Sequence, residues 1–295
     1  GEDNEEGRVE TRPAERPITI EDLLTHTAGL SYDDDTVAGV PKLYAQADLW
    51  SADSLSNFTE KVAALPLAFE PGSHWHYSVA NDVLGRLIEV VAAQPFDVFL
   101  EARILGPLKM KDTAFYVPDT KLDRFASLYR RDGAGMRLVE APADSDYRNA
   151  EPVPFGGSGL VSTAADYLRF AQMLLNGGEL DDVRLLGRKT VELMMTDHLG
   201  PGFERPRLNE SWLGRTENRS GDMNLGLGHG YGGYVITDVA ENDVPGSVGT
   251  YAWGGGASTY FFIDPQEELI GLFLTQLTPS SSRVQTTLAR YSRLT

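Results

Sequence analysis

Residues 75–91 read WHYSVANDVLGRLIEVV, and this stretch decides the fold because a tyrosine stands just before a helical pattern. The apolar residues that follow recur every three or four positions, as on a helix that turns one face to a core. They are Ala80, Val83, Leu84, Leu87, Ile88 and Val91. Ser78 is the expected N-cap. The stretch therefore predicts a core-facing helix with Tyr77 just before its N-terminus. Tyr77 is either a catalytic base or an aromatic residue packed in the core.

Two other stretches, ITIEDLLTHTAGL (18–30) and STAADYLRFAQMLLNGG (162–178), carry both a capping pair and a glycine stop. These signals are Thr19, Asp22 and Gly29 in the first stretch and Thr163, Asp166 and Gly177 in the second. SNFTEKVAAL (56–65) also has a helical pattern, as does FDVFLEARIL (96–105), which ends before Gly106-Pro107. The middle of the chain is thus predicted to be largely helical.

The last third of the chain changes to short runs of β-branched and aromatic residues broken by turn residues. The runs are YGGYVI (231–236), VGTYAWG (248–254), STYFFID (258–264) and LIGLFLTQ (269–276). DPQEE (264–268) is expected to form a tight hairpin between the last two. We expect neighbouring antiparallel strands here, a surface loop over 200–230 before them, and a terminal helix over 282–294 packed on them.

Composition excludes several classes of function. The formal net charge of −17 and the pI near 4.7 repel phosphate backbones, so nucleic acid is not an expected partner. The absence of cysteine excludes disulfides, thiolate metal sites and a cysteine nucleophile. No stretch approaches a membrane span, and the start GEDNEEGRVE lacks the features of a signal peptide. A soluble protein is expected, with the cytoplasm favoured over the periplasm or secretion.

Three familiar motifs are weak here. The five histidines have no metal-ligand spacing, so no metal site is expected; they are His26, His74, His76, His198 and His229. GHGYGG (228–233) fits G-x-G-x-x-G in letters, but a strand pattern follows it where a dinucleotide site needs a helix. GGSG (156–159) and PGSVG (245–249) both depart from the nucleophile elbow G-x-S-x-G. We interpret these glycine-rich stretches as turns.

The remaining candidates are Tyr77 and the stretch Trp253-Gly254-Gly255-Gly256. A phenol has a pKa near 10, so a tyrosine base needs a cation such as lysine to hold it ionised. Glycines on a strand let an acyl group lie against the backbone, where N–H groups stabilise an oxyanion. Together the two features indicate acyl transfer. Each feature alone is more often structural: a packed aromatic, and a bulge or close crossing of strands.

Four segments in order resemble the class C β-lactamase-like serine hydrolases, a family that includes penicillin-binding esterases and DD-peptidases. The segments are TIEDLLTHTAGL, WHYSVANDVLGRLIEVV, FGGSGLVSTAADYLRFAQMLLNGGEL and GTYAWGGGASTYFFIDPQEELIGLFLTQ. The resemblance runs from about Ile18 to the C-terminus. It is strongest to the carboxylesterase branch, whose third motif is W-G-G rather than K-T-G.

The resemblance implies a role for each candidate residue. Tyr77 matches the tyrosine that works with a lysine as general base toward a nucleophilic serine, and then as acid toward the leaving group. Trp253, Gly254 and Gly255 match the third motif, and Gly256 matches the residue whose N–H completes the oxyanion hole. Val79 stands where the second motif, Y-x-N, commonly has asparagine. This departure disfavours β-lactam cleavage more than ester cleavage.

The family's nucleophile lies in an S-x-x-K motif upstream of TIEDLLTHT, and no serine of this sequence has lysine three residues later. We therefore expect no nucleophile in this chain. Three explanations are open: a fragment of a longer hydrolase, one piece of a processed or two-chain enzyme whose partner chain supplies S-x-x-K, or a non-catalytic descendant. Retention of Tyr77 and the W-G-G stretch favours the first two.

The sequence thus predicts an α/β (α+β) serine β-lactamase/DD-peptidase-like fold in one N-terminally incomplete domain, 1–295. A mostly helical lobe is expected over about 18–225, and antiparallel strands with a terminal helix over about 226–295. The expected activity of the full-length protein is hydrolysis of a small ester or amide through an acyl-serine, without cofactor or metal, while this chain alone is expected to be inactive. The alternatives are a ligand-binding protein of the same fold, or a β-lactamase, DD-peptidase or acyltransferase of the family.

Overall fold

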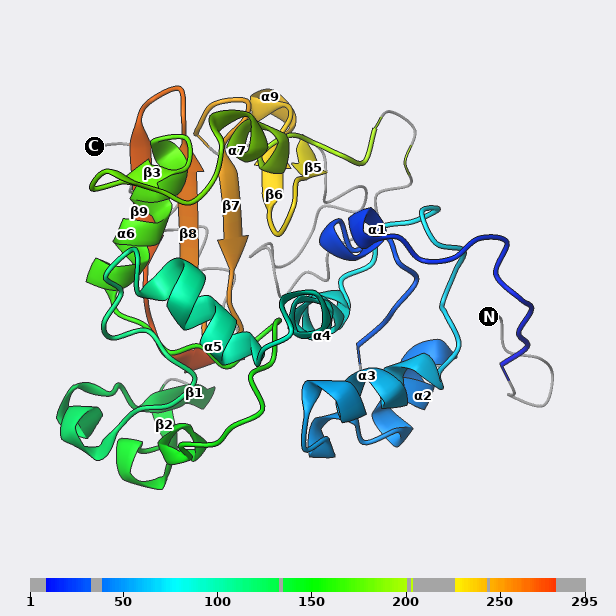
Figure 1. Ribbon diagram of the computed structural model, residues 1–295, viewed down its shortest axis with the longest axis horizontal. Coiled ribbons are helices and arrows are strands. Elements are labelled where there is room, and N and C mark those ends of the chain that lie inside the picture. Colours follow the sequence, from blue (N-terminus) through cyan, green and yellow to red (C-terminus); the bar gives the residue numbers. More distant parts are fainter. Residues whose placement is uncertain are drawn as a thin grey trace. The chain divides into compact units, whose positions relative to one another are not determined.

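The computed structural model describes residues 9–32, 39–132, 135–200, 203, 226–242 and 245–279. The predicted terminal helix and most of the predicted loop over 200–230 lie outside these residues. The chain divides into two compact units (Figure 1). The described parts of 1–100, 153–159 and 199–206 form the first unit, and those of 101–152, 160–198 and 207–295 form the second. No described helix is long and apolar enough to cross a membrane.

The first unit is built from short helices around one long helix. They are α1 (Ile20–Leu24), α2 (Val40–Gln46), α3 (Leu55–Ala63), α4 (Ala80–Ala92) and α5 (Phe96–Leu100). Helices α1, α3 and α5 all contact α4. The predicted helices over 56–65 and from residue 80 are therefore confirmed, whereas α2 has no counterpart in the sequence-based expectations.

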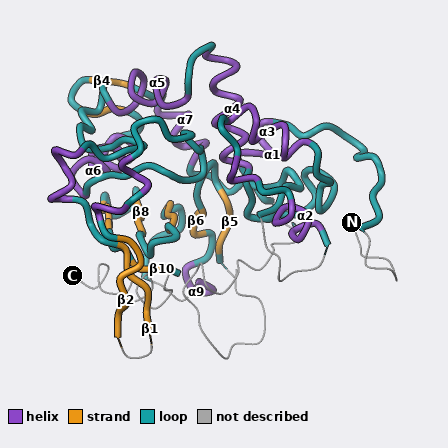
Figure 2. Tube along the Cα trace, turned by 90° about the horizontal axis from the view of Figure 1, so that it is seen from below, coloured by secondary structure: helices purple, strands orange, loops and turns teal. Residues whose placement is uncertain are grey.

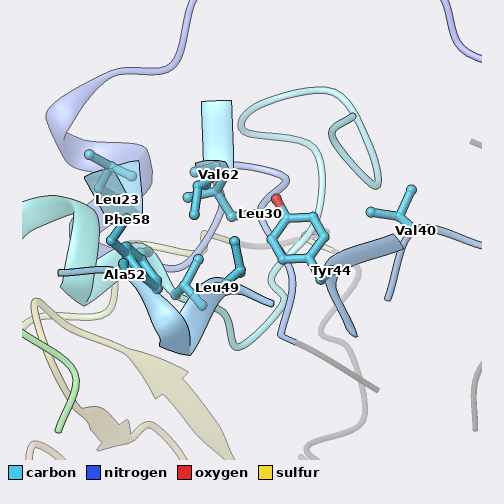
Figure 3. Close-up of a cluster of buried hydrophobic side chains, with 11 residues drawn as sticks. Leu23, Leu30, Val40, Tyr44, Leu49, Ala52, Phe58 and Val62 are labelled. Atoms are coloured by element: carbon cyan, nitrogen blue, oxygen red, sulfur yellow. The ribbon is translucent and has the colours of Figure 1, made fainter. Parts of the chain in front are cut away.

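A hydrophobic core holds helices α1 to α4 together, because their apolar residues turn toward the same interior (Figure 3). Tyr44 of α2 and Phe58 of α3 are fully buried in it. Val79 and Ala80, at the start of α4, belong to the same cluster. Burial of such side chains contributes about 1.5–3 kcal/mol each. The start of α4 is thus fixed by core packing.

Helix α1 has the predicted capping box but ends earlier than predicted. The Thr19 hydroxyl accepts from the Asp22 N–H, and the Asp22 carboxylate accepts from the Thr19 N–H. The helix ends at Leu24, not near Gly29, because His26 takes the left-handed conformation with φ +55°. The His26 and Thr27 N–H groups then bond back to the carbonyls of residues 23 and 22, as in a Schellman motif.

The expectation that Ser78 caps α4 is wrong. The N-cap is Val79, and no side chain caps the helix. Ser78 is buried, and its Oγ lies 3.4 Å from Nδ1 of His26. Its hydroxyl is therefore turned toward the loop after α1 instead of toward the first N–H groups of α4.

In the second unit, helix α6 (Ala164–Leu175) contacts strands β8 and β9 (Figure 1). Thr163 caps it as predicted, by accepting from the Asp166 N–H. The Asp166 carboxylate does not return the bond; it accepts from the Asp112 N–H at 2.6 Å and from the Thr113 hydroxyl at 3.0 Å. The predicted pair is thus half a capping box, and Asp166 ties α6 to the segment before it. The helix over 96–105 is confirmed as α5 continued by a π-helical stretch, Glu101–Leu105.

A five-stranded antiparallel sheet forms the main part of the second unit, in the order β5-β6-β7-β8-β9. Its strands are β5 (Leu227–His229), β6 (Tyr234–Ile236), β7 (Tyr251–Gly254), β8 (Tyr260–Asp264) and β9 (Leu269–Phe273). The runs predicted as neighbouring strands are confirmed as β6 to β9, and the turn after Asp264 joins β8 to β9 as expected. Strand β5 falls where the sequence predicted loop.

In the second unit, two small sheets and two short helices were not predicted. Strands β1 (Leu128–Asp132) and β2 (Gly135–Glu140) form a hairpin, and β10 (Leu277–Thr278) adds to β1 in parallel (Figure 2). Strands β3 (Glu179–Leu180) and β4 (Val183–Arg184) pair after α6, ahead of α7 (Arg188–Met194) and α9 (Val239–Asn242). The mixture of helices and antiparallel sheets confirms the predicted α+β class.

Candidate active site

Tyr77 lies in the first unit, on the loop that enters α4. Backbone hydrogen bonds hold this loop against the segment after α1: His76 N–H donates to the His26 carbonyl at 2.8 Å, and Val79 N–H donates to that of Ser31 at 3.3 Å. The loop is fixed at its other end by the buried Val79. Tyr77 is thus positioned by backbone contacts on one side and by the core on the other.

The Tyr77 ring packs against two other rings of the same unit. Its centroid lies 4.9 Å from that of His26 and 5.1 Å from that of Tyr32. Burial raises the pKa of Tyr77; a hydrogen bond with Tyr32 lowers it, and the Asp82 carboxylate raises it. The phenol is therefore protonated at neutral pH, and use as a base requires a cation close to it.

His26 is a site residue that the sequence analysis did not single out. It is buried, its φ of +55° is uncommon for a residue with a side chain, and its ring contacts both Tyr77 and Trp75. Left-handed non-glycine residues cluster at functional sites, where the surrounding structure compensates for the strain. Its position in LLTHT, directly after a short helix, was the available signal.

Asp82 is the second residue that the sequence analysis missed. It lies in the first turn of α4, is fully buried, and accepts a hydrogen bond from the Gly157 N–H at 2.9 Å. Burial raises the pKa of Asp82 to about 6, although backbone N–H groups, Gly157 first, lower it. An acidic residue in the first turn is common for reasons of helix electrostatics alone. The position of Asp82 in the sequence therefore gave no sign of a functional role.

Trp253 and its glycines lie in the second unit, at the end of β7. Trp253 pairs with Phe261 and Gly254 with Tyr260 across β7 and β8. Gly255 and Gly256 follow the last residue of β7, in the turn to β8, so the glycine stretch lies at the strand end and not wholly on the strand. A Cβ on Gly256 would meet no atom of the described residues within 4 Å. The backbone at Gly256 is thus open to a ligand.

The Trp253 side chain rests on two residues from the neighbouring strands. The His229 ring meets it edge-on at 5.7 Å, and Tyr234 lies 6.2 Å from it. Burial lowers the pKa of His229 to about 4, so this histidine is neutral at pH 7. GHGYGG, which contains His229, forms the β5–β6 hairpin, and this confirms its interpretation as a turn.

Among the described residues, no group of three or more His, Asp or Glu side chains is arranged to hold a metal ion. His74 and His76, the only pair with suitable spacing, approach different serines: Nδ1 of His74 lies 2.8 Å from Oγ of Ser73, and Nε2 of His76 lies 3.3 Å from that of Ser31. A pocket of about 450 Å³ in the second unit contains none of the predicted site residues.

The structure thus assembles Tyr77, His26, Tyr32 and Asp82 in the first unit, and Trp253 with His229 and Tyr234 in the second. Val79, at the position where the Y-x-N motif has asparagine, is fully buried in the first unit's core. The first group offers a phenol packed against an imidazole, which are groups that move protons. The second offers an aromatic wall beside an open backbone.

The chain is similar in sequence to several known proteins. The Protein Rv1367c of Mycobacterium tuberculosis is 37% identical over 92% of the chain and 65% of its own length. The Lovastatin esterase of Penicillium rubens is 33% identical over 88% of the chain and 64% of its own length. The chain thus spans slightly less than two thirds of these relatives.

Among solved structures, "EstCE1, a hydrolase with promiscuous acyltransferase activity" superposes with a TM-score of 0.74. Its sequence is 28% identical, and the match covers 92% of this chain and 71% of that one. The family model described as Beta-lactamase matches residues 8–293, nearly the whole chain. The chain therefore belongs to the Beta-lactamase family, as its four motif segments predicted.

Proposed function

We propose that the full-length protein is a serine hydrolase that cleaves small carboxylic esters through an acyl-serine intermediate. The observation that carries the proposal is the half-buried phenol of Tyr77 at the N-terminal end of α4, packed against His26 and Tyr32. Relatives named as an esterase and as a hydrolase with acyltransferase activity support this reaction class. No metal or cofactor has a role in the proposed reaction.

In the proposed reaction Tyr77 takes part in two proton transfers. Tyr77 accepts the proton of a serine hydroxyl as the serine oxygen attacks the ester carbonyl, and it then donates that proton to the departing alcohol oxygen. The Gly256 N–H donates to the oxyanion of the tetrahedral intermediate. Water repeats both steps and releases the acid. No serine of this sequence precedes a lysine by three residues, so we place the nucleophile and its lysine outside this chain.

Val79 supports esters over β-lactams as substrates. A β-lactam antibiotic carries an amide side chain that an asparagine in the second motif can bond. Val79 offers no hydrogen-bonding side chain, and it is fully buried. A simple ester has no such amide, so its binding loses little. The choice between water and an alcohol as acyl acceptor separates hydrolysis from acyl transfer.

The test is the Tyr77→Phe variant of the full-length protein, assayed with p-nitrophenyl esters of short acids. We expect ester turnover to fall by at least about a hundredfold, the contribution of one general base. Tyr44→Phe is the matched control, because Tyr44 is a buried tyrosine of the same unit. Near-normal turnover by Tyr77→Phe would make Tyr77 structural and would remove the proposal.

A second measurement addresses the location of the nucleophile. Intact-mass analysis after treatment with a fluorophosphonate probe should show an adduct on the full-length protein and none on the 295-residue chain. An adduct on this chain would contradict the placement of the serine outside it. If the full-length protein gives neither adduct nor turnover, the ligand-binding alternative replaces the enzymatic one.

A further inference from the structure

His26 contacts four consecutive residues of the loop before α4, and Tyr77 is one of them. The His26 carbonyl accepts from the His76 N–H at 2.8 Å. The His26 ring meets that of Trp75 edge-on, with the centroids 6.1 Å apart, and it is tilted against the Tyr77 ring at 4.9 Å. Nδ1 of His26 lies 3.4 Å from Oγ of Ser78. A single buried residue thus touches every position of WHYS.

The chain reversal at His26 does not explain why this position holds a histidine. His26 is the left-handed residue of the turn that ends α1, with φ +55°. Glycine is the usual residue at such a position, because a Cβ in the left-handed conformation crowds the backbone. Three residues later the same segment does use glycine, at Gly29 with φ +81°. The conformational cost of His26 is therefore offset by contacts of its side chain.

Those contacts help to fix both the backbone and the ring of Tyr77. Segment 26–32 bonds the loop on either side of the tyrosine: the His26 carbonyl accepts from residue 76, and the Ser31 carbonyl accepts from the Val79 N–H at 3.3 Å. Two rings of the same segment pack against the Tyr77 ring, that of His26 at 4.9 Å and that of Tyr32 at 5.1 Å. Rings at these distances restrict the rotamers that Tyr77 can take.

The position of the phenol oxygen matters for the proposed reaction. Proton transfer requires the oxygen to lie within hydrogen-bond reach of the proton that it takes. This oxygen lies at the far end of the Tyr77 side chain, so a small rotation about the Cα–Cβ bond displaces it. A misplacement of about 1 Å can lower turnover by about a hundredfold. A residue that restricts the ring therefore contributes to the rate without touching the substrate.

We propose that His26 is a positioning residue that holds Tyr77 in the orientation for proton transfer, through its ring against the tyrosine ring and its carbonyl on the preceding N–H. The proposal rests on the proposed function, since it gives His26 its purpose through Tyr77. The imidazole transfers no proton in this role. Loss of the His26 ring should therefore lower kcat and leave KM nearly unchanged.

The experiment is a double-mutant cycle on the full-length protein, with His26→Asn, Tyr77→Phe and the double variant assayed on a p-nitrophenyl ester. Asparagine adopts the left-handed conformation more readily than most residues, so His26→Asn keeps the turn and removes the ring. We expect kcat to fall by about 10–100-fold in His26→Asn, with KM within about threefold of wild type. The double variant should be no slower than Tyr77→Phe, because no phenol is left to position.

His76→Asn is the matched control, because it makes the same substitution in the same loop. The His76 ring approaches Phe69, with the centroids 6.2 Å apart, and Oγ of Ser31. This variant should keep kcat within about twofold of wild type. His26→Gly provides a second test if His26→Asn does not fold, because glycine keeps the left-handed turn without strain. It should show the same loss of kcat.

A measurement on the wild type needs no variant at the His26 position. In the full-length protein, NMR should show a nuclear Overhauser effect between the ring protons of His26 and Tyr77, whose tyrosine signals Tyr77→Phe identifies. The absence of this effect in folded protein would remove the contact on which the proposal depends.

Four kinetic results would also overturn the proposal. Wild-type kcat in a folded His26 variant would leave the histidine without a role in the reaction, and a raised KM with unchanged kcat would give it a role in binding. Additive losses in the double variant would show that His26 acts independently of Tyr77. An equal loss in His76→Asn would indicate general disruption of the loop. Failure of the proposed function is distinguishable, because it appears as normal turnover by Tyr77→Phe itself.

Discussion

A buried carboxylate makes the stability of a protein depend on pH, and Asp82 does so with an unusual sign. Burial first of all raises its pKa from 3.8 to about 6. The native state therefore binds this proton more tightly than the unfolded chain does. The resulting stabilisation is fully present below about pH 3.8 and is lost as the pH rises through about 6. A shift of about two units corresponds to about 3 kcal/mol.

Urea unfolding of wild type and Asp82→Asn between pH 4 and pH 7 tests this prediction. The asparagine side chain does not ionise, so the free energy of unfolding of wild type should fall relative to the variant by about 2–2.5 kcal/mol across this range. Parallel curves for the two proteins would show that Asp82 titrates as in the unfolded chain.

At the same scale, the sequence predicted the place of Tyr77 but not its surroundings. Tyr77 is marked by its position before a strong helical pattern. His26 contacts Tyr77 because of a left-handed turn after α1, and Asp82 is buried by the close approach of segment 153–159. Neither contact has a periodic signature, because each depends on where the chain returns in space. For the same reason Ser78, a good cap by residue type, faces His26 instead.

The sequence predicted helices and strands correctly where one face of the element is clearly apolar. Helices α4 and α6 and strands β6 to β9 carry strong periodicity. Strands β1 and β2 were not predicted because their side chains are mostly exposed, so buried and exposed residues do not alternate along them. Strand β5 was not predicted because the residues on either side of it, Gly226 and Gly230, are glycines, which favour turns. The length of an exposed strand depends on its hydrogen-bonded partner strand, and the sequence of the strand alone does not show which partner it has.

The anchoring of segment 153–159 to α4 predicts a large effect for a small substitution. Gly156→Ala would place a methyl group 2.0 Å from the Asn81 carbonyl oxygen, a backbone atom of α4, so segment 153–159 would have to shift away from the helix. We expect a loss of about 2–3 kcal/mol in the free energy of unfolding, measured with urea. Gly135→Ala is the control, because its methyl group would meet the Asp132 carbonyl oxygen at 3.6 Å, and a change within about 0.5 kcal/mol is expected. Equal effects would refute the close approach.

Helix α1 should respond to acid in the opposite sense to Asp82. Burial raises the pKa of Asp22, but hydrogen bonds from Arg16 and Thr19 outweigh it and hold the pKa at about 2. A depressed pKa gives stability above about pH 4 that is lost as the pH falls through about 2. Arg16 is partly exposed, so we discount the full shift to about 1–2 kcal/mol.

The check is Asp22→Asn, which should lower the free energy of unfolding by this amount at pH 7 and by much less at pH 2. A constant difference over this range would mean that the capping bonds, and not the charge, stabilise α1. Far-ultraviolet circular dichroism at both pH values confirms that the comparison concerns folded protein.

For the molecule as a whole, the formal net charge of −17 dominates the long-range electrostatics. Charges of one sign repel within the folded state, and salt screens that repulsion beyond about 10 Å at 0.1 M ionic strength. We expect the melting temperature at pH 7 to rise between about 10 and 200 mM sodium chloride. Near the pI of about 4.7 the net charge disappears, so the salt effect should shrink there. A melting temperature that falls with salt at pH 7 would show that local ion pairs outweigh the net charge.

The glycines of segment 153–159 also limit how this protein can be redesigned. Gly156 and Gly157 each face α4 at a distance that leaves no space for a side chain. A library that randomises these positions, in the hope of reshaping the surroundings of Tyr77, would consist almost entirely of damaged variants. Gly256, after the end of β7, differs from them, because a Cβ there would meet no described atom within 4 Å. Under the proposed function, directed evolution toward new acyl groups should therefore start near Gly256 and leave Gly156 and Gly157 unchanged.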